Sequence, residues 1–129
     1  EAAVCRLLHT GRKEEKPLIQ KFNTGIARRY GIAAALLAEA IWTEIKENEF
    51  HGRCQYDGET WMCCSRKMFL IRMPYLTKHM VSTGLARLKR AGVLIKGEWN
   101  KGQSDRTGWY TFTPYGRKVM EESEDEDYA

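Results

Sequence analysis

The strongest helical pattern of apolar and polar positions runs from Ile32 to Asn48. Leu37, Ile41 and Ile45 repeat every four residues, and polar residues occupy the other side of the predicted helix. The alanines of this run favour helix and let a neighbouring element pack closely. We therefore expect a core helix over residues 32–48 that serves as scaffold rather than as a site.

Weaker patterns flank this helix on both sides. Asn23 and Thr24 are suitable N-caps for a short helix over residues 25–30, which Gly31 ends. We expect residues 18–22 to form a short strand and residues 1–17 to form a weakly ordered arm. After the long helix, Asp57-Gly58 is a turn signal within a loop or hairpin. Residues 61–64 then read as a short strand at the edge of a sheet.

Two helices separated by a tight turn are predicted between Ser65 and Ala91. Ser65 can cap the first helix and Pro74 ends it, because the residue before a proline is pushed out of helix. Thr77 can cap the second helix, whose apolar face comprises Val81, Leu85 and Leu88. Gly84 lies beside that face and costs about 1 kcal/mol of helix propensity relative to alanine, so a close helix–helix contact is expected there.

The remaining chain predicts a β-hairpin and a final helix. Residues 93–99 and 109–113 are rich in β-forming residues, and the polar residues 100–108 connect them. A last helix begins at Thr113-Pro114 and reaches about Glu122. The order of elements predicts an α+β fold of the winged helix-turn-helix type, mostly α with a small antiparallel β wing. Tyr75, Trp99 and Trp109 are expected to belong to the core.

A winged helix-turn-helix predicts which side chains would meet DNA. Its second helix enters the major groove with its N-terminal residues at the base edges, and residues further along contact phosphate. The candidate base contacts are Lys78, His79, Ser82 and Thr83, and the candidate phosphate contacts are Arg87, Arg90, Arg66 and Lys67. The wing residues Lys96, Lys101 and Arg106 would contact the flanking backbone or the minor groove. Each of these residues could equally be a solvated surface side chain, and Arg106 could pair locally with Asp105.

The charged residues divide the chain into a basic body and an acidic end. Of the 17 acidic residues, six lie in 121–127, which leaves 11 against 21 basic residues in the first 120 and a net +10 there. A basic body suits a polyanionic partner such as DNA. We expect an arm over 1–17, one DNA-binding domain over 18–120 and a disordered acidic tail over 121–129. The tail is either simply solvated or competes with DNA for the basic surface.

Other chemistries find little support in the residues. Cys63 and Cys64 would face opposite sides of their strand, one inward and one outward, and the four cysteines are expected to be reduced. The pair His51 and Cys54 has no second pair at zinc-ligand spacing, so we expect no metal and no cofactor. Catalytic motifs are lacking, and the protein is expected not to be an enzyme. With no membrane-length apolar run or signal-peptide pattern, a cytoplasmic location is expected.

Several sequence stretches together carry a family resemblance. They are Lys21-Phe-Asn-Thr24, Ile26-Ala-Arg-Arg-Tyr-Gly31, Tyr56-Asp-Gly-Glu-Thr-Trp61, Phe69 to Lys78, Leu85 to Gly97 and Asn100 to Thr113. They resemble the small winged-helix proteins of phages, mobile elements and gut Firmicutes described as replication-initiator or replisome-organiser-like N-terminal domains. The stretch Asp105-Arg-Thr-Gly-Trp-Tyr110 is the most specific part.

The resemblance implies a protein that binds double-stranded DNA in replication initiation or transcription control, with replication proteins as further partners. Ser82 and Thr83 depart from the family, in which basic residues are common at these positions, so modest sequence specificity is expected. The alternative is a winged-helix adaptor that binds another protein through the acidic tail. A homodimer formed through the terminal segments is also left open.

Overall fold

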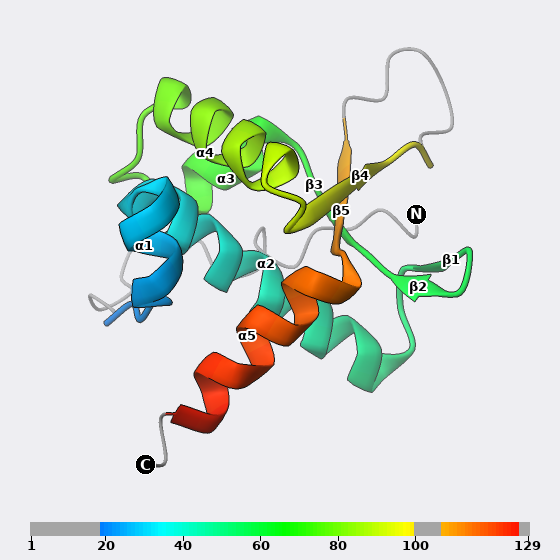
Figure 1. The fold of residues 1–129 in the computed structure, drawn as a ribbon. Coiled ribbons are helices and arrows are strands. Elements are labelled where there is room, and N and C mark those ends of the chain that lie inside the picture. Colours follow the sequence, from blue (N-terminus) through cyan, green and yellow to red (C-terminus); the bar gives the residue numbers. More distant parts are fainter. Residues whose placement is uncertain (1–18, 100–106, 127–129) are drawn as a thin grey trace.

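The structure is a computed structural model that describes residues 19–99 and 107–126, with side chains as far as Glu122 (Figure 1). Within these residues the chain is an α+β arrangement of five helices and two small antiparallel sheets. The elements are α1 (Thr24–Tyr30), α2 (Ile32–His51), β1 (Gln55–Tyr56), β2 (Glu59–Thr60), β3 (Met62–Cys64), α3 (Arg66–Arg72), α4 (Lys78–Arg90), β4 (Leu94–Gly97), β5 (Gly108–Phe112) and α5 (Pro114–Glu126).

The first two helices follow the sequence pattern closely. The Asn23 side-chain oxygen accepts a hydrogen bond from the Ile26 amide at 3.0 Å and caps α1, as expected. Gly31, with φ +100°, lets the chain turn directly from α1 into α2. The predicted end of α2 at Asn48 is three residues short, because the helix continues to His51 and ends at the left-handed Gly52. The strand predicted for 18–22 is wrong, since residues 19–22 have no regular structure.

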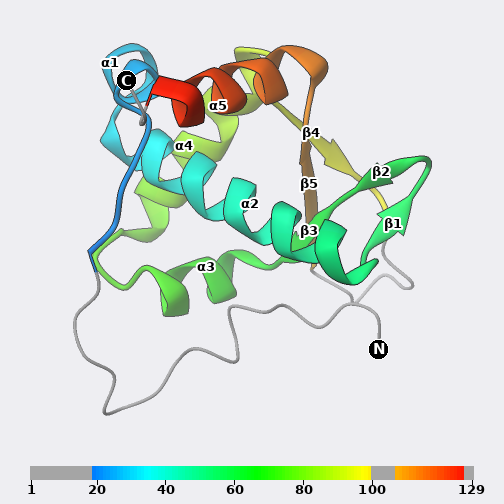
Figure 2. The same cartoon turned by 90° about the horizontal axis from the view of Figure 1, so that it is seen from below.

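The main core surrounds α2, which lies between α3 and α5 (Figure 2). Helix α4 also packs on α2, where a Cβ built on Gly84 would lie 2.6 Å from Leu37 Cδ1 and 3.4 Å from the Ala34 backbone. The close helix–helix approach predicted from this glycine is therefore confirmed. The buried residues that complete the core come from all sides, namely Ile26, Phe69, Val81, Leu85, Leu88, Met62, Tyr110, Phe112 and Met120.

The larger sheet has the strand order β3-β5-β4, with both pairs antiparallel. Met62 pairs with Tyr110 across β3 and β5, and Leu94 pairs with Phe112 across β4 and β5. The prediction of β3 as an edge strand is confirmed. Ser65 follows β3 directly, and its hydroxyl oxygen accepts a hydrogen bond from the Met68 amide at 3.2 Å. The sheet edge and the start of α3 are thus joined without a connecting loop.

The β1–β2 hairpin adds a second, smaller core to the molecule. Its turn residues Asp57 and Gly58 both have positive φ, as a type I′ turn requires, which confirms the turn predicted there. The cluster comprises Cys54, Trp61, Cys63 and Trp109, with Tyr56 and Trp99 packed against it. Cys64 faces the main core and Cys63 faces this cluster, so the two thiols lie on opposite sides of β3, as predicted. Both are buried, because the cluster covers the side that was expected to face outward.

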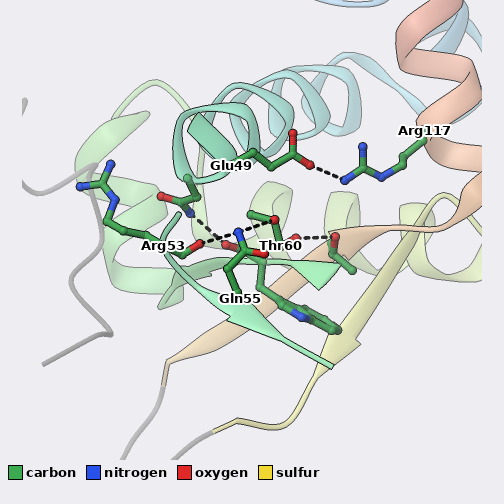
Figure 3. A network of polar contacts seen from close by, with 8 residues as sticks. Glu49, Arg53, Gln55, Thr60 and Arg117 are labelled. Atoms are coloured by element: carbon green, nitrogen blue, oxygen red, sulfur yellow. Dashed lines mark hydrogen bonds and ion pairs between the residues drawn. The ribbon is translucent and has the colours of Figure 1, made fainter. Parts of the chain in front are cut away.

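Polar contacts join the end of α2 to the hairpin and to α5 (Figure 3). The buried Asn48 donates a hydrogen bond from Nδ2 to the Trp61 carbonyl at 2.9 Å. The Thr111 hydroxyl donates to the Thr60 carbonyl at 2.8 Å, which joins the small hairpin to β5. At the surface, Arg117 pairs with Glu49 at 2.8 Å. These contacts join the C-terminal end of α2 to α5 and to the residue that follows the hairpin, and they join the hairpin to β5.

The last helix carries acidic residues away from α4. Thr113 caps it by accepting a hydrogen bond from the Gly116 amide at 2.9 Å. The predicted end at about Glu122 is too early, because α5 continues to Glu126. The disordered tail predicted over 121–129 is therefore helical over 121–126, and residues 127–129 lie outside the described residues. The helix leaves the end of β5 and points away from α4 (Figure 1). Glu122 reaches a pocket between α1 and α5 that Asn23 and Arg29 also line.

Candidate nucleic-acid interface

Helix α4 presents one buried and one open side, as its sequence pattern predicts. Thr77 caps the helix by accepting a hydrogen bond from the Met80 amide at 3.1 Å. Val81, Gly84, Leu85 and Leu88 are buried against the rest of the protein. The flanks and the opposite side hold the predicted contact residues of this helix. Among them, Lys78, His79, Arg87 and Arg90 are exposed, while Ser82 and Thr83 are half-buried.

Two of the predicted base-contacting residues interact with each other. The Thr83 hydroxyl and His79 Nε2 lie 3.3 Å apart, one helical turn from each other. A hydroxyl and an imidazole ring nitrogen that share a hydrogen bond have fewer free donors and acceptors for a base edge. The pair therefore reduces the hydrogen-bonding capacity at the middle of the open side of α4.

Arg87 has a partner within the protein. Its guanidinium donates a hydrogen bond from NH1 to the Tyr30 carbonyl oxygen at 3.1 Å, at the C-terminal end of α1. Cations are favourable there because the last carbonyls of a helix carry partial negative charge. The structure thus places Arg87 on the flank of α4 that faces α1. Arg90, at 100° per residue, falls in line with His79 and Thr83 on the open side.

Further cations lie where α3 begins and along β4. Arg66, Lys67 and Lys96 are exposed and line an open pocket of about 720 Å³ together with Thr107, Gly108 and Tyr110. Glu98 also lines this pocket and is its acidic member. Since α4 packs against both α3 and β4, the pocket and α4 belong to one region of the molecule. Lys101 and Arg106 lie outside the described residues.

The charge of this region follows from a simple property of the sequence. Between Thr60 and Gly97 the chain has no Asp or Glu, but eight basic residues, namely Arg66, Lys67, Arg72, Lys78, Arg87, Lys89, Arg90 and Lys96. The elements α3, α4 and β4 themselves therefore contain no acidic residue. The predicted contacts do not include Lys89 and Arg72, which the acid-free span adds as further basic residues of this region. Lys89 is exposed on α4, whereas Arg72 is half-buried.

The aromatic residues near this region have different roles. Trp109 is buried, as predicted, and Trp99 packs on the second core with its ring stacked on Tyr56 at a centroid distance of 5.3 Å. Tyr75 is not part of the core, because 52% of its surface is exposed in the turn between α3 and α4. Tyr110 is buried, and this burial raises the pKa of its phenol, while the nearby Arg66 acts in the opposite direction.

Other kinds of site find no support in the part of the chain that the structure describes. It contains no group of three or more His, Cys, Asp or Glu side chains placed to hold a metal ion. Nor is any helix of the described ranges long and apolar enough to cross a membrane. Comparisons with protein families, with curated proteins and with solved structures found no match for this chain.

Proposed function

We propose that this chain is a winged helix-turn-helix protein that binds double-stranded DNA through α4, the start of α3 and the β4–β5 hairpin. In this arrangement α3 and α4 form the helix-turn-helix, and β4 and β5 form the wing. The order of elements supports this assignment. The helix pair α3–α4 is followed by the hairpin β4–β5, and β5 also pairs with the earlier edge strand β3, which is typical of the fold.

The observation that carries the proposal is the cluster of exposed cations on α4 and around the neighbouring pocket, where Glu98 is the acidic member. Lys78, Lys89 and Arg90 are exposed on α4, and Arg66, Lys67 and Lys96 are exposed beside it. Clustered cations that outnumber nearby acids favour binding to the phosphate backbone of nucleic acid. If α4 enters the major groove, the cations of the open pocket between α3 and β4 would lie beside the DNA backbone that flanks this groove.

The same surface favours phosphate contacts over base reading. Arginine and asparagine make the bidentate base contacts worth about 1–3 kcal/mol, and the open side of α4 offers only Arg90 among them. Ser82 and Thr83 are half-buried, and Thr83 already contacts His79. We therefore propose binding with low sequence preference and a steep dependence on salt.

The process that this binding serves is either replication initiation or transcription control, and here the support is the sequence resemblance alone. Replication proteins would be further partners in the first case. The choice between the two processes changes nothing in the expected interface.

The test is fluorescence anisotropy with a labelled duplex of arbitrary sequence across a salt series. If the six exposed cations named above each neutralise one phosphate, the slope of log affinity against log salt is expected to be about −5. Replacing Lys78 and Arg90 together by alanine should reduce this slope by about 2 and weaken binding at every salt concentration.

The matched control replaces two cations on the side of α5. Lys46 contacts the Trp42 ring from α2, Lys118 is exposed on α5, and their double alanine variant has the same change in net charge. This control should keep the salt slope of the unaltered protein. No binding at low salt, or equal loss in both double variants, would overturn the proposed function and favour the adaptor that binds another protein.

A further inference from the structure

Two cysteines of the second core face each other. The Sγ atoms of Cys54 and Cys63 lie 4.0 Å apart, and neither sulfur is in a disulfide. Cys54 lies between the end of α2 and β1, and Cys63 lies in β3. The Cys54 carbonyl accepts a hydrogen bond from the Trp61 amide at 2.9 Å, which fixes the two segments side by side. The two thiols are therefore neighbours because of the hairpin that separates them in sequence.

The two thiols differ in their surroundings. Cys54 is 9% exposed to solvent and is followed by the exposed Gln55, whereas Cys63 is only 2% exposed. The hydrogen bond with Cys63 lowers the pKa of the Cys54 thiol, and the adjacent Arg53 acts in the same direction. Burial and Glu44 oppose this shift. A thiol with more thiolate character reacts faster with disulfides, which makes Cys54 the attacking member of the pair.

We propose that Cys54 and Cys63 are a dithiol site that reacts with a low-molecular-weight disulfide, such as oxidised glutathione, to form a reversible intramolecular disulfide. The sulfurs must approach from 4.0 Å to about 2.05 Å. Cys54 has φ +56°, which is uncommon for a residue with a side chain. Cys54 lies in the short connection between α2 and β1, whereas Cys63 is held within β3. We therefore expect Cys54 to move toward Cys63 when the bond forms.

The reaction balances in two steps. The Cys54 thiolate attacks one glutathione sulfur, forming a mixed disulfide and releasing one glutathione thiolate, which takes up the proton lost by Cys54. Cys63 loses its proton and attacks the Cys54 sulfur, forming the Cys54–Cys63 bond and releasing the second glutathione. The protein loses two hydrogen atoms and two electrons, and one oxidised glutathione becomes two reduced ones. Excess reduced glutathione reverses both steps.

The bond would restrain the part of the fold that supports α3. Cys63 precedes Cys64 and Ser65, and Ser65 caps α3. Cys63 is also paired with Trp109 in β5. A disulfide would therefore fix the end of α2, the edge of the sheet and the start of α3 to one another. It reduces the conformational freedom of the unfolded chain as well, so the oxidised protein should unfold at a higher temperature.

The experiment uses the full chain with Cys5 replaced by serine, so that three thiols remain. After incubation in glutathione buffers of graded ratio, free thiols are alkylated and peptides are mapped by mass spectrometry. A Cys54–Cys63 crosslink is expected, with a single transition along the series and full reversal by excess reduced glutathione. The melting temperature of the oxidised form should rise by roughly 5 °C or more.

Cys64 provides the matched control. It neighbours Cys63 but faces the main core, where its thiol donates a hydrogen bond to the Ser65 carbonyl at 3.4 Å. Cys64→Ala should keep the crosslink, while Cys54→Ala and Cys63→Ala should lose it. Separate alkylation of Cys54 and Cys63 in the most oxidising buffer, or a crosslink that involves Cys64, would overturn the proposal. These outcomes do not depend on DNA binding, so they are separate from the test of the proposed function.

Discussion

Gly84 and Leu37 bring α4 and α2 into close contact, since a Cβ on the glycine would lie 2.6 Å from Leu37 Cδ1. Leu37 is fully buried, so its methyl group has little room to move aside. This contact determines how far the basic side of α4 stands from the core. The position of the proposed interface thus depends on a residue that has no side chain.

Gly84→Ala is expected to lower the free energy of unfolding by about 1–3 kcal/mol. Alanine would gain about 1 kcal/mol of helix propensity, but overpacking against Leu37 outweighs that gain. Urea denaturation followed by circular dichroism measures the difference. In a Leu37→Ala background the same substitution should cost less, because the methyl group then has space. A stability gain from Gly84→Ala in the unaltered background would contradict the contact.

Arg87 and Arg90 are expected to act differently although both are exposed cations of α4. Arg87→Ala removes the hydrogen bond to the Tyr30 carbonyl and should destabilise the protein by about 0.5–1.5 kcal/mol. Arg90→Ala should leave stability nearly unchanged and weaken DNA binding. Paired urea titrations and anisotropy measurements separate the two effects. Equal effects of both variants on stability would mean that the Arg87 contact contributes nothing.

Lys89 is expected to contribute to DNA binding as much as Arg90, although the sequence interpretation left it out. It is exposed on the flank of α4 that also carries Lys78 and Ser82. Lys89→Ala should reduce the salt slope by about 1 without changing sequence preference. Lys118→Ala on α5 serves as the control with the same charge change. If the Lys89 variant binds DNA as tightly as this control, Lys89 does not belong to the interface.

Tyr110 should make the protein sensitive to alkaline pH. Burial raises the pKa of its phenol above the ordinary value of 10.0, so the unfolded chain ionises first as pH rises. The contribution of the neutral phenol to stability is complete below pH 10.0 and declines above it, by up to about 1.4 kcal/mol per pH unit. Tyr110→Phe should show a smaller decline. Urea denaturation of both proteins on each side of that pH measures the difference, and parallel declines would contradict the burial effect.

The helices and the order of the elements could be predicted because each rests on local signals. Asn23, Ser65 and Thr77 each accept the N-capping hydrogen bond that their residue types predict. Gly84 marked a close contact, and Asp57-Gly58 marked a turn. The buried face of α4 also followed from spacing alone, since Val81, Leu85 and Leu88 are all buried.

The errors come from contacts between residues far apart in sequence. The second core covers the outer side of β3, so the thiol of Cys63, which alternation places on that side, is fully buried. Arg87 meets Tyr30 across 57 positions of sequence, and no local pattern contains that contact. Tyr75 is exposed because the turn places it outside both helices. Spacing within one element cannot reveal what another element covers.

The direction of α5 separates acidic from basic residues within the part of the chain that the structure describes. Glu121, Glu122, Glu124, Asp125 and Glu126 belong to a helix that points away from α4, while the acid-free basic span lies at the other end. In the field of a polyanion, such a molecule experiences a torque that turns α4 inward and the end of α5 outward. The protein would therefore be oriented before its first contact, and its association rate would fall as salt screens the field.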